Sequence, residues 1–210
     1  YIIVFMIEFA ETGRLTPARE KIVAELMRQP WFQATDTRLQ QELALLPQKG
    51  KENHDGFLQD LASRKEVIGG ARVLKMQGLN RGNFALIPVF EVEANGTQYT
   101  YEYVSWRYGP QSGAKGIVFV RPPIPGASPT HFITLLGEKF APGKKVNDTI
   151  GGFIDLGVEG VQTLMDKIHR EVSEELGVDD LKIDEVVDLG PIYTDPGMTN
   201  NNPRLFAAFI

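Results

Sequence analysis

The sequence contains no cysteine, and this absence excludes several kinds of site. A chain without thiols forms no disulfide framework and no thiolate metal site, and it has no cysteine nucleophile. This composition suits a reducing compartment, so we expect a cytoplasmic protein.

Long hydrophobic runs are also missing. The longest run, YIIVFMI at residues 1–7, is far shorter than the roughly 20 apolar residues of a membrane span. It also lacks the basic flank of a signal peptide. We therefore expect a soluble protein that has no membrane partner.

Positive charge is in short supply. The chain of 210 residues has 22 Lys and Arg against 27 Asp and Glu, a net charge of -5, and no dense basic stripe. Proteins that bind nucleic acids usually present such a stripe to the phosphate backbone, so we expect no nucleic acid partner. With 42% apolar residues, the length suffices for one domain with a modest extension.

The first 80 residues predict a small helical domain or extension. TPAREKIVAELM at residues 16–27 has a threonine cap, a proline in the first turn and apolar residues at helical spacing. DTRLQQELALL and DGFLQDLASRKEV repeat this pattern after breaks rich in proline, glycine and polar residues. We find no residues here that indicate catalytic chemistry.

The pattern changes to strands in the remainder, residues 81–210. FALIPVFEVEANGTQYTYEYVSWRY predicts a hairpin around ANG, and AKGIVFVRP, THFITLLGE and DTIGGFIDL predict three further strands. A helix over about 160–176 and strands near 182–190 and 204–210 follow. This order predicts an α+β fold. Because the chain begins at Tyr1 and ends in an uncovered apolar strand, RLFAAFI, we expect a longer native protein, with this domain truncated at its C-terminus and Met6 as the original start.

Three glutamates crowd the last turns of the predicted helix. Glu171, Glu174 and Glu175 lie within about 100° of arc at the edge of its apolar stripe, although like charges one turn apart repel. A hard cation such as Mg²⁺ prefers such oxygen ligands and leaves positions open for phosphates. A solvated acidic face is the alternative interpretation, because charged helix faces usually point to water.

The same segment resembles the Nudix box, the signature of the Nudix hydrolases. REVSEELGV at residues 170–178 agrees with the fixed positions of the second half of the box, which are Arg170, Glu171, Val172, Glu174, Glu175, Gly177 and Val178. Gly151 and Gly152 resemble the turn that opens the box. The distance from Gly152 to Arg170 is about one helical turn longer than in the family. The first glutamate of the family pattern has no exact counterpart. Glu159 is the nearest candidate, whereas counting back from Arg170 reaches Gln162.

Further segments resemble the ADP-ribose or ADP-sugar pyrophosphatase branch of this family. NGTQYTYEYVSWRYGPQSGAKGIVFV is similar to the paired N-terminal strands that subunits of that branch exchange in a homodimer. DPGMTN at residues 195–200 resembles a loop of the eukaryotic ADP-sugar enzymes. The resemblance covers about residues 85–210 and implies a Nudix fold, a mixed β-sheet sandwiched by helices, with an N-terminal helical extension.

The resemblance also implies the roles of the site residues. Glu171, Glu175, Glu174 and the Gly151 carbonyl are expected to bind Mg²⁺, for which Mn²⁺ is a substitute. Glu174 is also expected to orient the attacking water, and Arg170 to orient the glutamates through charge-assisted hydrogen bonds. A metal clamp of this kind neutralises diphosphate oxygens and activates a bound water. The expected products are AMP and a sugar phosphate.

Substrate contacts are expected from Trp106, Lys139, Gly197 and Asn200. Tyr103 is an alternative to Trp106 as the aromatic platform for adenine, and a place in the core is the alternative interpretation for both, because buried aromatic residues are common. Where relatives have an arginine at the end of one strand, this chain has Ala141, so the contact is lost or passes to Lys139 or Lys144. Asn201 stands where many bacterial relatives have a catalytic glutamate, and asparagine cannot act as a base.

Three functions remain open on this reading. The first is Mg²⁺-dependent hydrolysis of a nucleoside diphosphate sugar, with ADP-ribose as the leading candidate. The second is the same chemistry on another nucleoside diphosphate derivative. The third is a Nudix-fold module that binds a nucleotide or a protein without hydrolysis, which the longer box, Ala141 and Asn201 favour.

Overall fold

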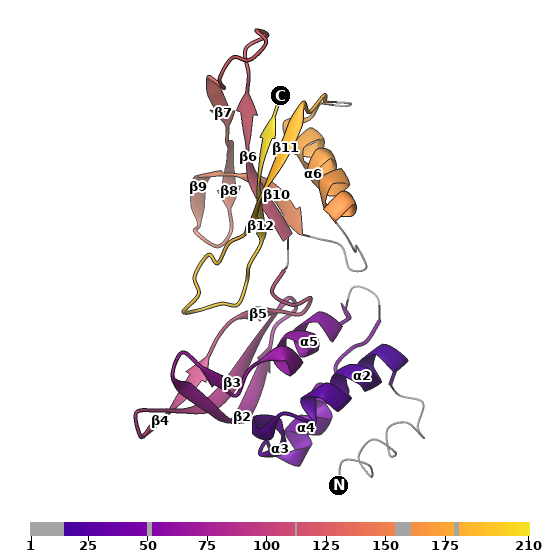
Figure 1. The fold of residues 1–210 in the computed structure, drawn as a ribbon, viewed down its shortest axis with the longest axis vertical. Coiled ribbons are helices and arrows are strands. Elements are labelled where there is room, and N and C mark those ends of the chain that lie inside the picture. Colours follow the sequence, from indigo (N-terminus) through magenta and orange to yellow (C-terminus); the bar gives the residue numbers. More distant parts are fainter. Residues whose placement is uncertain (1–14, 50–51, 112, 154–160, 179–180) are drawn as a thin grey trace. The chain divides into compact units, whose positions relative to one another are not determined.

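The computed structural model describes residues 15–49, 52–111, 113–153, 161–178 and 181–210 (Figure 1). The chain divides into two compact units. Unit 1 comprises Tyr1–Pro110 and Thr194–Asn201, and unit 2 comprises Gln111–Tyr193 and Asn202–Ile210. In the part of the chain that the structure describes, no helix is long and apolar enough to span a membrane.

Unit 1 begins with helices and continues with an antiparallel sheet. The helices are α2 (Pro17–Leu26), α3 (Pro30–Gln33), α4 (Thr37–Ala44) and α5 (Asp55–Ser63). The strands are β1 (Val67–Ile68), β2 (Ala71–Arg81), β3 (Ala85–Ala94), β4 (Thr97–Glu102) and β5 (Ser105–Trp106). The sheet has the order β1-β2-β3-β4, and β5 also pairs with β3.

The N-terminal helices begin where their caps predict. The Thr16 side chain accepts a hydrogen bond from the amide of Arg19 at 3.3 Å, and the Asp36 side chain accepts one from Arg38 at 2.9 Å. Both satisfy amide donors that the first turn of a helix leaves without intrahelical partners. The three predicted helices are confirmed as α2, α4 and α5.

One buried cation joins these helices. The Arg19 side chain has no exposed surface and donates to Asp55 Oδ1 at 2.6 Å and to the carbonyls of Ala44, Leu46 and Pro47. Burial lowers the pKa of Arg19, and its hydrogen bond to Asp55 opposes this. Arg19 therefore ties the end of α4 to the start of α5.

The helical region is shorter than predicted. Strands β1 and β2 lie almost entirely before residue 81, in the segment predicted as helical, and they belong to the same sheet as β3. Val73 and Met76 are both buried although they are three residues apart, because register shifts interrupt the β2–β3 pairing. This spacing hides the alternation that marks a half-buried strand.

The predicted ANG hairpin is confirmed as β3 and β4. Asn95 and Gly96 form its tip with φ of 53° and 75°. Positive φ at both central residues is typical of the two-residue turn that matches strand twist. Beneath the sheet, Trp31 makes edge contacts with Phe32 and Phe90 in the core of unit 1.

Unit 2 is built on a mixed sheet covered by one long helix. Its elements are β6 (Gly113–Val120), β7 (His131–Ile133), β8 (Leu135–Lys139), β9 (Lys144–Asp148), β10 (Ile150–Phe153), α6 (Val161–Leu176), β11 (Glu185–Pro191) and β12 (Arg204–Phe209). The order is β10-β6-β12-β11, with β12 parallel to β6, and β7 also pairs with β6. β8 and β9 form a separate hairpin (Figure 1).

The segment THFITLLGE, predicted as one strand, forms the two strands β7 and β8. The predicted long helix is α6, and Gly177, with φ of 63°, ends it as the sequence indicates. The predicted strands near 182–190 and 204–210 are confirmed as β11 and β12.

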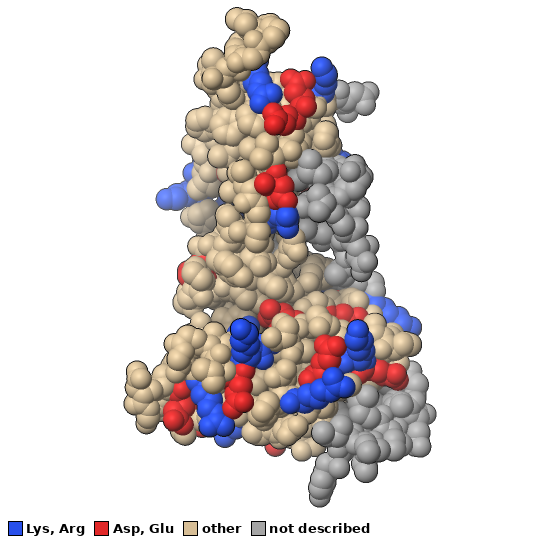
Figure 2. Space-filling model, viewed as in Figure 1, with Lys and Arg blue, Asp and Glu red and all other residues tan. Residues whose placement is uncertain are grey.

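Charges of both signs are mixed on the face seen in Figure 2, where basic side chains over the elements of unit 1 lie beside acidic ones. The ion pairs of its sheet, such as Arg72 with Glu66 and Lys75 with Glu91, show the same mixing. Exposed pairs of this kind contribute little to stability.

Candidate functional site

The double glycine of β10 lies directly against the glutamate helix. A Cβ added to Gly152 would lie 2.5 Å from Oε1 of Glu171, so the carboxylate occupies the space that any other residue would fill. A Cβ on Gly151 would collide with the carbonyl of Ala114 on the neighbouring strand. Close approach to backbone therefore requires glycine at position 151, whereas a Cβ at position 152 would displace the Glu171 carboxylate.

Helix α6 is fixed in this position by its apolar face. Val172 is fully buried in a cluster with Ala114, Val118 and Ile150, and Leu176 packs against the same cluster. Because Glu171 directly precedes Val172, burial of the valine brings the glutamate to the edge of β10. Glu171 and the double glycine, both predicted to bind the metal ion, are therefore neighbours.

The other two glutamates are more exposed. Glu174 lies 3.5 Å from Arg170 Nε in an ion pair whose side chains are 61% and 56% exposed, and Glu175 is also exposed. Arg170 therefore forms an ion pair with one glutamate of the helix. Among the described residues, no group of three or more acidic or histidine side chains stands ready to hold a metal ion.

The donor chemistry nonetheless suits a hard cation. Three carboxylates and the backbone of a double glycine supply only oxygen, the ligand that Mg²⁺ and Mn²⁺ prefer. Gly152 leaves room for the Glu171 carboxylate beside the strand. The predicted candidates Glu159 and Gln162 for the first glutamate of the box, and the longer spacing itself, fall outside the side chains that the structure describes.

Lys139 lies at the end of β8, in an ion pair. Its Nζ is 3.0 Å from Asp148 Oδ2, and the same carboxylate also lies 3.3 Å from Lys115 Nζ. Sequence reasoning missed Lys115 and Asp148. Lys115 is the one charged residue in the apolar run of β6, and this feature of the sequence could have identified it. Its partner Asp148 is 33 residues away, and nothing in the local sequence indicates the contact.

The remaining predicted substrate residues lie in unit 1. Trp106 is half-buried in β5 and pairs with Ala85. The Gly197 carbonyl accepts a hydrogen bond from Tyr101 Oη at 3.2 Å, and Asn200 Nδ2 donates to Asp60 Oδ2 at 2.9 Å. These contacts hold residues 195–200 against β4 and α5 of the same unit.

Tyr103, the alternative aromatic platform, is a core residue. It is 5% exposed, stacks on Phe90, and its hydroxyl accepts a hydrogen bond from Arg64 at 2.7 Å. Burial raises the pKa of Tyr103, so its hydroxyl stays protonated. A ring covered in this way is not available to stack on adenine.

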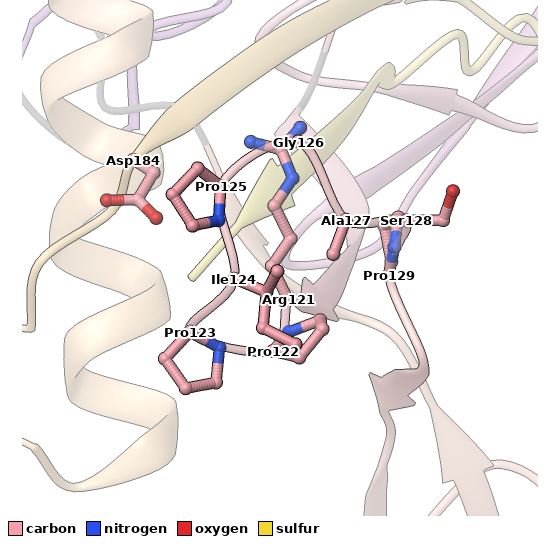
Figure 3. A pocket seen from close by; sticks show the side chains of 10 residues that line it. All are labelled: Arg121, Pro122, Pro123, Ile124, Pro125, Gly126, Ala127, Ser128, Pro129 and Asp184. Carbon is pink, nitrogen blue, oxygen red and sulfur yellow. The ribbon is translucent and has the colours of Figure 1, made fainter.

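A cavity in the described residues lies elsewhere in unit 2. It measures about 690 Å³ and is lined by the segment 121–129, rich in proline, and Asp184 (Figure 3). This segment follows the C-terminal end of β6, whereas the double glycine pairs with the N-terminal residues of that strand. None of the predicted site residues lines this cavity.

Comparison with known proteins gives a result at the level of the fold. No protein-family model matches the chain, and a search of curated proteins finds no match. Among solved structures, the chain is similar to the crystal structure of an ADP compounds hydrolase, a Nudix enzyme, with a TM-score of 0.51. The chain has a Nudix-like fold. The sequence identity is 15%, and the match covers 69% of this chain and 70% of the other. The structural similarity confirms the predicted fold class.

Proposed function

We propose that the protein is a Mg²⁺-dependent pyrophosphatase that hydrolyses a nucleoside diphosphate sugar, with ADP-ribose as the leading candidate. The observation that carries the proposal is the Glu171 carboxylate lying against Gly152 in a Nudix-like fold. This arrangement supports the proposal because Glu171, a proposed metal ligand, lies beside the double glycine that belongs to the same box pattern. The similar solved structure is that of an enzyme acting on ADP compounds, which supports the substrate class.

Each residue has a defined task in this proposal. Glu171, Glu175, Glu174 and the Gly151 carbonyl would hold Mg²⁺ or Mn²⁺, which when bound neutralises phosphate oxygens and acidifies water. Glu174 orients the attacking water, and the ion pair at 3.5 Å lets Arg170 restrict the Glu174 side chain. Hydrolysis forms one bond from the water oxygen to phosphorus and breaks the bond to the bridging oxygen. The products are AMP and a sugar phosphate.

The proposal assigns substrate contacts to Lys139, Trp106, Gly197 and Asn200. The Lys139 side chain is 46% exposed. All four contacts stay predictions from the resemblance. A homodimer formed through the N-terminal strands of the Nudix domain, in residues 95–120, and a cytoplasmic location also stay predictions.

Product release tests the proposal. The protein is incubated with Mg²⁺ and ADP-ribose, ADP-glucose, UDP-glucose or NADH, and released AMP or UMP is measured by chromatography. We expect AMP from ADP-ribose, and at least a hundredfold less from Glu175→Gln, since loss of one charged ligand weakens both metal binding and charge neutralisation. Glu138→Gln, at an exposed position of β8, serves as the matched control and should keep full activity.

A binding module without hydrolysis is the second candidate. The exposure of Glu174 and Glu175 favours it, because ligands of a tightly held metal are usually packed against other groups. Binding of ADP-ribose without product from any member of the panel would establish this alternative. Equal product from wild type and Glu175→Gln would instead show that the metal ligands are assigned wrongly.

A further inference from the structure

Lys115, Lys139 and Asp148 form a charged cluster in unit 2. Asp148, at the end of β9, lies 3.3 Å from Lys115 Nζ and 3.0 Å from Lys139 Nζ. Asp148 also accepts a hydrogen bond from the amide of Thr149 at 2.8 Å, which fixes the position of the carboxylate. The three side chains come from β6, β8 and β9, so their contact depends on the fold.

The cluster carries a surplus of positive charge. In the β8–β9 hairpin, Lys139 pairs directly with Lys144, so both side chains project from the same face of the hairpin. Lys139 and Lys144 therefore share this face with Asp148, and Lys115 reaches the same carboxylate from β6. Like charges opposite each other destabilise a strand pair, and a bound anion would relieve this repulsion.

The cluster lies next to the double glycine. Lys115 is paired with Gly151 in the β10–β6 ladder, and its neighbour Ala114 is buried under α6. Because side chains alternate along a strand, Lys115 projects from the face opposite α6 and Glu171. The ammonium groups thus form a positively charged position separate from the acidic one.

The side chains are available to a ligand. Lys115 and Lys139 are 50% and 46% exposed, whereas Asp148 is 27% exposed. Each ammonium group has three hydrogens, and the contact with Asp148 uses one of them. The carboxylate holds the two lysines near one point, which lowers the conformational entropy lost when both bind the same anion.

We infer that Lys115 and Lys139, held by Asp148, form a binding site for the phosphate group of a nucleotide or a related phosphate ester. Lys144 adds charge from the same face of the hairpin. The inference rests on the proposed function only for the identity of the natural ligand. The site requires neither a metal ion nor turnover.

Calorimetry with inorganic pyrophosphate in the presence of EDTA tests this site. We expect the wild type to bind pyrophosphate and each of Lys115→Gln and Lys139→Gln to weaken binding about threefold, with about tenfold for the double variant. Lys182→Gln is the control, because Lys182 is also an exposed lysine paired with an aspartate, Asp184, at 3.3 Å. Its affinity should equal that of the wild type.

Amide NMR spectra locate the binding. Pyrophosphate should shift the amide signals of residue 115 and of Gly151 in the wild type and not in the double variant. Absence of binding by the wild type, or equal affinity of the wild type and the double variant, would overturn the inference. If the enzyme fails to hydrolyse any substrate while these lysine effects persist, the proposed function fails and the phosphate site stands.

Discussion

At the scale of single residues, Gly152 has the most direct link to the proposed chemistry. The atoms that a Cβ would meet belong to the end of the Glu171 side chain, which is flexible. Substitution should therefore displace the carboxylate and leave the backbone in place. The absence of a Cβ at Gly152 therefore leaves the Glu171 carboxylate in its place beside β10.

Gly152→Ala is accordingly expected to lower AMP release from ADP-ribose by about a hundredfold, because small displacements of catalytic groups have effects of this size. The melting temperature should change little. Gly137→Ala in β8 is the matched control, since a Cβ at Gly137 meets nothing within 4 Å. Equal activity of both variants would contradict a role of the Gly152–Glu171 contact in catalysis.

Arg19 has a comparable importance for stability. Arg19→Ala should lower the free energy of unfolding of unit 1 by about 3 kcal/mol, because it leaves the Asp55 carboxylate and three carbonyls without their donor. Urea unfolding followed by tryptophan fluorescence measures this, since both tryptophans lie in unit 1. Arg28→Ala, at an exposed position, should change the value by less than about 0.5 kcal/mol. A similar loss in both variants would contradict the role of the buried network.

At the scale of elements, the tip of the β3–β4 hairpin depends on positive φ. Gly96→Ala should destabilise unit 1 by about 1 kcal/mol, because an L residue with a Cβ is strained at φ of 75°. Gly78→Ala in β2, where a Cβ meets nothing within 4 Å, is the control and should be neutral or slightly stabilising. Urea midpoints of the two variants give the comparison, and an unchanged midpoint for Gly96→Ala would refute the turn assignment.

The sequence predicted elements well where one local pattern decides them. Thr16 and Asp36 cap their helices, and Gly177 ends α6, as expected from residues a few positions apart. Prediction failed in β2, where register shifts disturb the alternation. It also missed the contact of Asp148 with Lys115, because only the pairing of distant strands brings these two residues together.

At the scale of the whole molecule, two ion-paired carboxylates of unit 2, Asp148 and Asp188, predict sensitivity to acid. Burial raises the pKa of Asp148, but Lys139 and Lys115 together bring it below its usual value. The hydrogen bond from Arg204 lowers the pKa of Asp188. A carboxyl group whose pKa is lower in the folded state stabilises that state above its unfolded pKa, and this stabilisation is lost as the pH falls through the folded value.

The free energy of unfolding of unit 2 should therefore fall as the pH drops below about 4. The double variant Asp148→Asn with Asp188→Asn should lose less over the same range, because its side chains do not titrate. Urea unfolding followed by NMR signals of unit 2 at a series of pH values tests this. Identical slopes for the wild type and the double variant would contradict the account.

The central claim is that the glutamates of α6 hold a divalent cation beside the double glycine. Diffraction from a crystal soaked in Mn²⁺ tests it most directly, because anomalous scattering identifies the ion. We predict a peak within coordination distance, about 2.2 Å, of Glu171 and Glu175 oxygens and of the Gly151 carbonyl. A map in which these side chains extend into solvent with no anomalous peak among them would contradict the claim.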